Sequence, residues 1–127
     1  SVSIRLKRAF EPASPEDGVR VLVERLWPRG VSKERAAVDL WLKDVAPSPE
    51  LRRWYGHEPA KWPEFRRRYR NELRNHEEEL AELRRLARHG PVTFVFGSRE
   101  TERNSAAVLR EVVEGRPVTG EETGEAV

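Results

Sequence analysis

The sequence Val-Arg-Val-Leu-Val-Glu-Arg-Leu-Trp-Pro-Arg-Gly, residues 19–30, decides the fold. It begins with an apolar run that predicts a β-strand up to Leu26, with the odd positions on the core side. Pro28 has no N–H group and cannot continue a sheet ladder, so the strand must end before it. In open α/β sheets, ligands bind beyond the carboxyl ends of the strands. The turn is therefore predicted to form the lip of a binding site. Its candidate side chains are Arg25, Trp27 and Arg29.

Three further segments predict strands that complete a small sheet. Residues 2–8 alternate between apolar and polar side chains, which is typical of a strand near a sheet edge. Residues 92–96 form an apolar run, which indicates a strand buried on both faces at the sheet centre. Residues 38–43 alternate again and predict a short strand. The linker at 11–18 is too short for a helical crossover, so the first two strands could pair directly, with an antiparallel arrangement open.

Helix signals separate these strands. Ser32 and Ser48 are good N-caps for two short helices. Apolar residues recur every three or four positions over residues 59–89 and predict one long helix. Helices are expected at 33–37, at 49–55, at 59–89, and from a cap at Ser98 or Thr101 to Glu114. The predicted fold is α/β, with a small central sheet of about four strands, largely parallel or mixed, flanked by helices that include one long helix.

The length of 127 residues and the composition restrict the class of protein. Residues 1–115 are predicted to form a single α/β domain, and residues 116–127 a disordered acidic tail. The lack of cysteine excludes disulfides, a thiolate nucleophile and cysteine-based metal sites. No apolar run reaches the roughly 18 residues that a transmembrane helix needs, and the start lacks a signal-peptide layout, so a cytoplasmic protein is expected. The arginine-rich composition fits either a thermophile or a GC-rich genome.

The charge is unevenly distributed along the chain. Residues 1–110 carry 23 Lys and Arg against 17 Asp and Glu, a net charge of +6, whereas residues 111–127 carry a net charge of −4. A basic body favours anionic partners such as phosphates, carboxylates or nucleic acid. Surface arginines also pair with neighbouring glutamates, and this alternative needs no ligand.

Two strand-to-loop junctions carry side chains that could bind an anion. Arg25 and Arg29 can form planar bidentate contacts with a carboxylate or phosphate, and Trp27 can stack on a flat ligand. Ser98 and Arg99 follow the central strand at the predicted start of a helix, where backbone N–H groups attract anions. If the two strands are neighbours, both loops face one crevice. The structural alternative has Arg25 paired with an acid, Trp27 in the core and Ser98 as a helix cap.

Other polar residues could support catalysis instead of binding alone. Lys43 and Asp44 could transfer protons as a pair or form an ordinary ion pair. His57, followed by Glu58, could be a base with its orienting acid or a surface residue at a helix end. The three histidines lack the spacing of metal ligands, so no metal site is predicted. The sequence also lacks a phosphate loop, a dinucleotide-binding turn and a nucleophile elbow, and no cofactor is predicted.

Four motifs stand out when the chain is read in order. They are Arg-Leu-Trp-Pro-Arg-Gly at 25–30, Trp-Leu-Lys-Asp-Val-Ala-Pro-Ser at 41–48, Leu-Arg-Arg-Trp-Tyr-Gly-His at 51–57 and Gly-Pro-Val-Thr-Phe-Val-Phe at 90–96. Together they resemble the YeaO-like family of small bacterial and archaeal proteins, a domain of unknown function, over about residues 1–115. The resemblance implies a compact α/β fold and supplies no activity.

The family's pattern is also matched at individual polar and aromatic positions. These are Arg25, Trp27, Arg29, Lys43, Asp44, Trp54, His57 and Asn104. Where family members usually carry Tyr-Ala-Ala-Lys after the last strand, this chain has Phe-Gly-Ser-Arg at residues 96–99. A basic residue is kept there, but its chemistry differs.

The favoured prediction is a crevice, lined by arginine and tryptophan, that binds and could process a small anionic ligand such as a phosphate or carboxylate compound. The predicted ligand-binding residues are Arg25, Trp27, Arg29, Lys43, Trp54, His57, Ser98, Arg99 and Asn104. One alternative is a nucleic-acid-binding accessory protein that uses residues 66–70, with steeply salt-dependent binding. Another is a protein-interaction or regulatory module that uses the long helix as a docking or dimer surface. The sequence leaves open whether the protein is an enzyme and whether it forms homo-oligomers.

Overall fold

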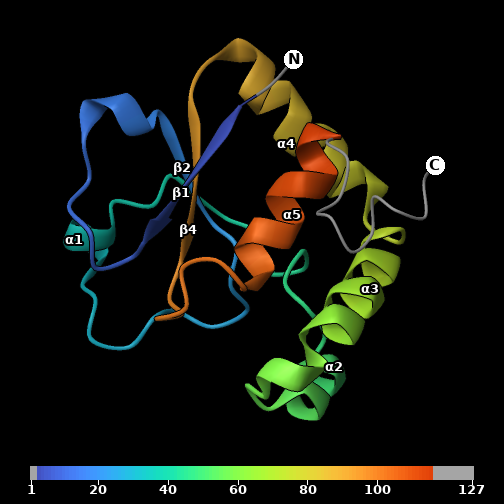
Figure 1. Cartoon of the computed structure of the whole chain (residues 1–127). Coiled ribbons are helices and arrows are strands. Elements are labelled where there is room, and N and C mark those ends of the chain that lie inside the picture. Colours follow the sequence, from blue (N-terminus) through green and yellow to red (C-terminus); the bar gives the residue numbers. More distant parts are fainter. Residues whose placement is uncertain (1–2, 116–127) are drawn as a thin grey trace.

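The centre of the molecule is a sheet in which every strand pairs in parallel, in the order β1-β4-β2-β3 (Figure 1). A computed structural model describes residues 3–115. The strands are β1 (Ile4–Arg8), β2 (Val19–Leu22), β3 (Leu40–Trp41) and β4 (Val92–Phe96). The predicted α/β class, the four strands and the central place of β4 are confirmed. Since all strands are parallel, their carboxyl ends meet at one edge of the sheet, where ligands bind in folds of this class.

The first two strands do not pair with each other, so their expected direct pairing is wrong. Val92 of β4 pairs with Ile4 on one side and with Val19 on the other. The link between β1 and β2 contains a 3-10 turn, η1 (Pro15–Asp17), and returns the chain so that β2 runs parallel to β1. A short linker therefore does not require an antiparallel hairpin when a third strand lies between the two.

Five α-helices lie within the described residues. They are α1 (Lys33–Ala36), α2 (Pro49–Tyr55), α3 (Trp62–Leu73), α4 (Glu77–His89) and α5 (Ser105–Glu114), and a 3-10 turn, η2 (Pro59–Lys61), precedes α3. Ser32 and Ser48 cap α1 and α2 as predicted, because each hydroxyl accepts the N–H of the residue three positions on. Between residues 3 and 115, no helix is long and apolar enough to cross a membrane. The predicted tail, residues 116–127, lies outside the described residues.

The apolar stripe over residues 59–89 belongs to two helices, so a continuous helix there is wrong. α3 ends at Leu73 and α4 begins at Glu77. Between them, three successive N–H groups donate to carbonyls three residues back, and His76 leaves the helical region with φ −125° and ψ 42°. Both Leu73 and Leu80 are buried. The apolar spacing therefore continues across the break, and this is why the pattern does not reveal it.

The two faces of the sheet carry separate cores. The larger core contains Val21, Phe94 and Phe96 together with apolar residues of α3, α4 and α5. The smaller core contains Leu22 and Val95 together with a residue of α1. Because side chains alternate along a strand, β2 and β4 serve both cores at once. The unbroken apolar sequence of β4 is explained by this burial on both faces.

A buried ionic cluster lies where the chain enters β2. Asp17 is fully buried and lies 2.6 Å from Arg20 Nη1 and 3.1 Å from Lys7 Nζ. Arg20 also donates to the Ala36 carbonyl, and the Ser14 N–H donates to Asp17. Burial raises the pKa of the Asp17 carboxyl, but the hydrogen bonds from Ser14, Lys7 and Arg20 outweigh burial and lower this pKa to about 2. Lys7, Asp17 and Arg20 are called the closed cluster below.

Candidate functional site

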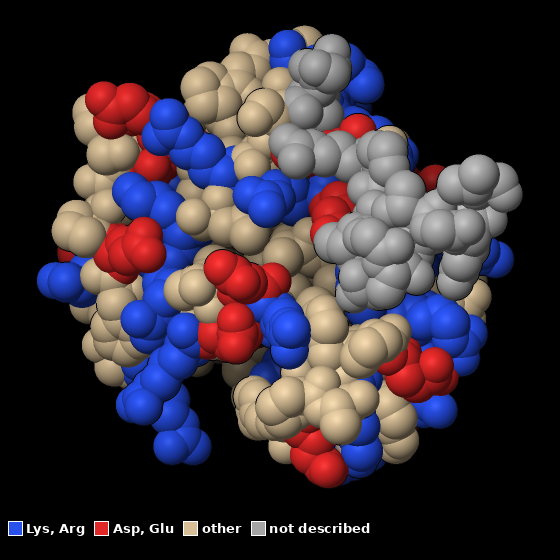
Figure 2. Space-filling view, in the orientation of Figure 1, with Lys and Arg blue, Asp and Glu red and all other residues tan. Residues whose placement is uncertain are grey.

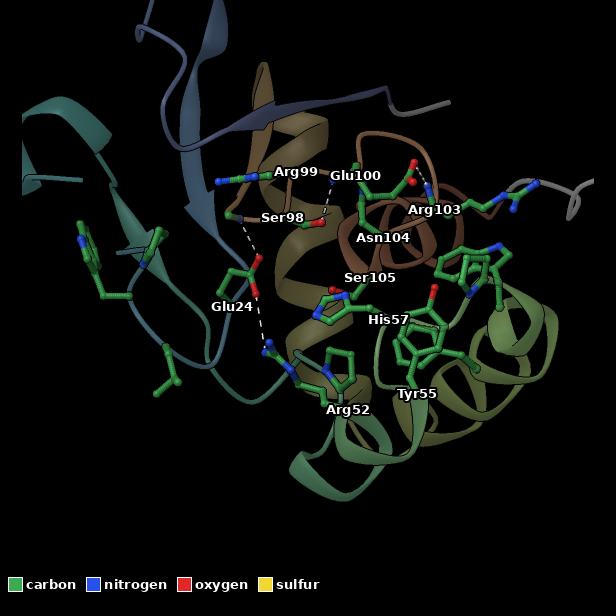
Figure 3. A pocket seen from close by; sticks show the side chains of 18 residues that line it. Glu24, Arg52, Tyr55, His57, Ser98, Arg99, Glu100, Arg103, Asn104 and Ser105 are labelled. Carbon is green, nitrogen blue, oxygen red and sulfur yellow. Dashed lines mark hydrogen bonds and ion pairs between the residues drawn. The ribbon is translucent and has the colours of Figure 1, made fainter. Parts of the chain in front are cut away.

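A cavity of about 690 Å³ opens beyond the carboxyl ends of β2 and β4 (Figure 3). Its wall is made by the segment after β2, by the end of α2 with the turn that follows, and by the loop from β4 to α5. The lining residues are Glu24, Leu26, Trp27, Pro28, Pro47, Arg52, Tyr55, His57, Pro59, Trp62, Phe65, Gly97, Ser98, Arg99, Glu100, Arg103, Asn104 and Ser105. Sites for small molecules commonly measure about 300–1,000 Å³, so the cavity has a suitable size.

The cavity brings together part of the predicted ligand-binding set. The members that line it are Trp27, His57, Ser98, Arg99 and Asn104. The members outside its wall are Arg25, Arg29, Lys43 and Trp54, and the catalytic candidate Asp44 also lies outside. The loops after β2 and β4 meet because these two strands are hydrogen-bonded neighbours. A cavity thus lies at the edge of the sheet where a crevice was expected, and part of the predicted residues line it. That these residues bind a ligand stays a prediction.

The two arginines of the first junction do not line the cavity. The Arg25 guanidinium donates to the Ala46 carbonyl at 3.1 Å and to the Pro47 carbonyl at 3.4 Å. It thereby ties the segment after β2 to the chain before α2. Arg29 is exposed at the surface. Arg25 thus has a structural role in the turn, Arg29 is directed to solvent, and neither lines the cavity.

Trp27 belongs partly to the core and partly to the cavity. Its indole N–H donates to the Val31 carbonyl at 2.7 Å, and its ring packs edge-on against Trp41 with 5.5 Å between ring centroids. Lys43 is exposed, and its Nζ lies 4.3 Å from the centre of the Trp41 ring. Asp44 is also exposed. The Lys43–Asp44 junction is therefore a surface feature next to the smaller core, away from the cavity.

Trp54 fastens α2 to α3 by cation–π contacts. The Lys61 ammonium lies 4.9 Å from the centre of the indole ring, and the Arg68 guanidinium lies 4.2 Å from it. Lys61 also donates to the Trp54 carbonyl at 2.7 Å. These contacts give Trp54 a structural role in the packing of the two helices.

Glu24 and Arg52 form an ion pair inside the cavity, and neither was predicted from the sequence. β2 ends at Leu22, earlier than the predicted Leu26, so Glu24 lies beyond the strand. Its Oε2 accepts the Gly97 N–H at 2.8 Å, which joins the loops after β2 and β4. Its Oε1 lies 3.8 Å from Arg52 Nη1. Glu24 and Arg52 are called the open pair below.

A sequence signal exists for one member of the open pair and not for the other. Glu24 is the single acid within residues 19–30, at the end of an apolar run, and an isolated charge in such a place can mark a site. Arg52 lies on an exposed face of α2 beside Arg53, so nothing in the local pattern distinguishes the two. Only the packing of α2 against the sheet edge selects Arg52.

The end of α2 directs Tyr55 and His57 into the cavity. Gly56 and His57 both adopt left-handed backbone conformations, with φ of 54° and 59°, and they reverse the chain after the helix. Figure 3 shows the His57 ring facing the middle of the cavity. Burial raises the pKa of the Tyr55 hydroxyl, and the Glu100 carboxylate raises it further. The Tyr55 hydroxyl therefore stays protonated and can donate a hydrogen bond.

The helix after β4 begins later than predicted. The Asn104 side chain accepts the Ala107 N–H at 2.9 Å and caps α5, which starts at Ser105. A cap at Ser98 or Thr101 is therefore wrong. The helix N-terminus that was expected to attract an anion directly after β4 does not lie there, so Ser98 can contribute only its own polar groups to the wall.

The loop from β4 to α5 contributes two arginines and one acid to the cavity. The Glu100 carboxylate accepts the N–H groups of Arg103 and Glu102, each at 3.1 Å, and these hydrogen bonds lower the pKa of Glu100. The Glu100 carboxylate therefore stabilises the conformation of the loop. The side chains of Arg99 and Arg103 donate no hydrogen bond to any residue from 3 to 115, and Figure 3 shows them directed to opposite sides of the cavity. Both are therefore available to a ligand.

The basic residues of α3 are engaged by acids of the protein. Arg66 is buried and pairs with Glu111 of α5. Arg67 and Arg68 lie 2.6 Å and 2.8 Å from Glu64 on the same helix. Figure 2 likewise shows basic and acidic side chains interspersed over the visible face. The arginine-rich part of α3 is thus an internally compensated surface.

The chemistry of the cavity wall combines positive charge with aromatic surface. Arginines and a histidine are opposed by two glutamates, one of which serves the loop. The rings of Tyr55, Trp62 and Phe65 pack together, with 4.5 Å between the centroids of Tyr55 and Phe65. In the part of the chain that the structure describes, no group of three His, Asp or Glu side chains could hold a metal ion. The wall therefore places cationic side chains beside an apolar surface.

Comparison with known sequences defines the class of protein. Residues 3–126 match the family model described as the inactive DUF488-N3 subclade, and the chain therefore belongs to this family.

The similar proteins are small and of nearly the same length. The chain is 47% identical over 113 residues to an uncharacterized protein of Mycobacterium tuberculosis, with 89% of this chain and 95% of that protein covered. It is 41% identical over 108 residues to the uncharacterized protein YeaO of Escherichia coli, with 85% and 94% covered. The resemblance to the YeaO-like family is thus confirmed. No solved structure matches the chain significantly.

Proposed function

We propose that the cavity binds a small anionic ligand, such as a phosphate or carboxylate compound, without transforming it chemically. The observation that carries this proposal is that Arg52 of α2 lines the same cavity as Arg99 and Arg103 of the loop from β4 to α5, together with His57. Guanidinium groups bind carboxylates and phosphates through paired N–H donors. Since Arg99 and Arg103 have no acceptor among residues 3–115, a ligand can supply it.

Two features support binding without catalysis. The family is described as an inactive subclade. The residues that could transfer protons are also poorly placed for it, because Lys43 and Asp44 lie outside the cavity and Glu58 pairs with Lys61 at 3.0 Å instead of orienting His57. Among residues 3–115, His57 therefore has no acid paired with it of the kind that a catalytic base commonly uses. Its place in the wall suits a ligand contact.

The same geometry gives less support to the alternatives. A nucleic-acid contact face needs cations that are free to neutralise phosphates, whereas Arg66, Arg67 and Arg68 already pair with glutamates. A docking surface on the apolar stripe needs exposed side chains, whereas Trp62 and Phe65 are buried in the larger core. We therefore favour a small ligand in the cavity.

Calorimetric titration and thermal unfolding with indole-3-propionate and with sodium phosphate test this proposal. Sodium chloride keeps the ionic strength constant. At least one of the two anions is expected to bind and to raise the Tm above that in chloride alone, because a ligand that binds only the native state stabilises it. Arg52→Ala is expected to weaken binding about tenfold or more, since it removes a charged partner of the anion.

Arg53→Ala is the matched control, because Arg53 lies next to Arg52 on α2, is exposed and is not part of the wall. It should bind like the unaltered protein. The proposal is refuted if phosphate, indole-3-propionate and L-tryptophan all fail to bind beyond the effect of chloride, or if the two arginine variants bind the anion equally well.

A further inference from the structure

The open pair is incomplete as an ion pair. Glu24 Oε2 is occupied by the Gly97 N–H, but Oε1 lies 3.8 Å from Arg52 Nη1, which is beyond hydrogen-bond distance. The Glu24 side chain is 15% exposed and the Arg52 side chain 46% exposed. Figure 3 shows both groups at the cavity, with their charged ends toward each other. Each group therefore keeps hydrogen-bonding capacity for a ligand.

The open pair makes a plain anion a weaker ligand than one that also carries a positive charge. An anionic group that binds Arg52 also lies near the carboxylate of Glu24, and like charges about 4 Å apart repel each other. A ligand that also carries a positively charged donor converts this repulsion into attraction at Glu24 Oε1. The open pair thus selects for two opposite charges held close together.

The rest of the wall selects for an apolar group. Leu26 is 75% exposed and lines the cavity, so its side chain can contact an apolar part of a ligand. Tyr55 is partly buried and lines the cavity in front of the buried rings of Trp62 and Phe65, and Trp27 lines the cavity on the side of β2. Aromatic rings favour flat ligands through offset or edge-to-face contacts. The ligand is expected to bring a large apolar or aromatic body.

We propose that the ligand is an α-amino acid, or a close analogue, with a large apolar or aromatic side chain. Its carboxylate contacts Arg52, its ammonium group donates to Glu24 Oε1, and its side chain packs on Tyr55 and Leu26. In an α-amino acid, the ammonium and carboxylate groups are attached to the same carbon atom, which suits partners that lie 3.8 Å apart. This inference rests on the proposed function, since the carboxylate is the anionic group assigned there.

Calorimetric titration with three related indoles tests the inference. L-tryptophan carries both charges, indole-3-propionate lacks the ammonium group, and tryptamine lacks the carboxylate. L-tryptophan is expected to bind about tenfold or more tightly than either of the others, because each of them leaves one member of the open pair unpartnered. In Glu24→Gln, the preference for L-tryptophan over indole-3-propionate is expected to fall to about one, since the amide keeps an acceptor for the Gly97 N–H but loses the charge.

Glu50→Gln is the matched control, because Glu50 is an exposed acid on α2 outside the cavity wall. It should keep the full preference for L-tryptophan. The inference fails, while the proposed function stands, if L-tryptophan and indole-3-propionate bind the unaltered protein equally well, or if Glu24→Gln leaves the preference unchanged. Binding of tryptamine as tight as that of L-tryptophan, or no binding of any indole or of phosphate, overturns the proposed function as well. Should Glu24→Gln not fold, the comparison of the three indoles in the unaltered protein still decides.

Discussion

Two carboxylate–arginine pairs lie at opposite ends of β2, and they differ in the distance between their charged atoms and in their exposure to solvent. In the closed cluster, Asp17 and Arg20 are 2.6 Å apart, and the side chain of Asp17 is fully buried. In the open pair, Glu24 and Arg52 are 3.8 Å apart, and both side chains remain partly exposed. Asp17 also accepts from Lys7 and from backbone, so its oxygens are satisfied within the protein.

The contrast teaches how the same residue types divide between structure and binding. A buried charge is tolerated only when protein groups satisfy it completely, and such a group has nothing left to offer a ligand. A partly exposed pair at a distance of 3.8 Å keeps its hydrogen-bonding capacity and contributes little to stability. Substitutions in the closed cluster should therefore lower the free energy of unfolding, whereas substitutions in the open pair should change the affinity for a ligand.

The largest expected effect is from Asp17→Asn. This substitution leaves Arg20 and Lys7 without their buried counter-charge, so the free energy of unfolding should fall by about 3–5 kcal/mol. Urea unfolding followed by circular dichroism measures the change. A loss below about 1 kcal/mol would show that the closed cluster is no more important for folding than a surface pair.

Lowering the pH should remove the contribution of Asp17 to the free energy of unfolding of the unaltered protein. The pKa of Asp17 is lowered to about 2 in the folded state, whereas the pKa of an unfolded aspartate is about 3.9. The stabilisation is therefore present above about pH 4 and is lost as the pH falls toward 2, with a total of about 2 kcal/mol. Urea unfolding at pH 5 and at pH 2 measures it.

Asp17→Asn provides the reference for this pH series, because other carboxylates titrate in both proteins and their contributions cancel. The unaltered protein should lose about 2 kcal/mol more than Asp17→Asn between the two pH values. Equal losses in the two proteins would mean that the pKa of Asp17 is not lowered on folding.

The smallest expected effect on stability is from Glu24→Gln. Because the open pair is partly exposed and long, the free energy of unfolding should change by less than about 1 kcal/mol. The same urea experiment measures this change beside that of Asp17→Asn. A loss as large as that of Asp17→Asn would abolish the distinction between the two pairs and would mark Glu24 as a structural residue.

Local sequence patterns predicted most elements of the fold. The alternating residues of β1, the apolar run of β4 and the serine caps of α1 and α2 depend on near neighbours, and each was placed correctly. The order of the strands was less accessible, because β4 pairs with strands more than 70 positions earlier in the chain. The break between α3 and α4 was missed because the apolar spacing needed for burial continues across it.

The wall of the cavity contains only part of the residue set that the sequence predicts for ligand binding. Trp27, His57 and Arg99 were named from loops that follow strands and helices, and they line the cavity. Arg25 was named on the same grounds, but its guanidinium donates to carbonyls of residues 46 and 47. The direction of a long side chain depends on acceptors supplied by distant segments, and no local pattern contains that information.

The sequence by itself determined the strands, the caps and the edge of the sheet at which polar loops gather, because periodicity, missing N–H groups and capping side chains act over a few residues. Only the tertiary structure decided which charges are closed and which are open. Glu24 accepts the N–H of Gly97, which lies 73 positions later in the chain, whereas Asp17 is paired with Lys7 and Arg20, which are near it in the sequence. Burial and hydrogen-bond completion arise from how the segments pack, and they separate the charges that hold the fold from those that remain available to a ligand.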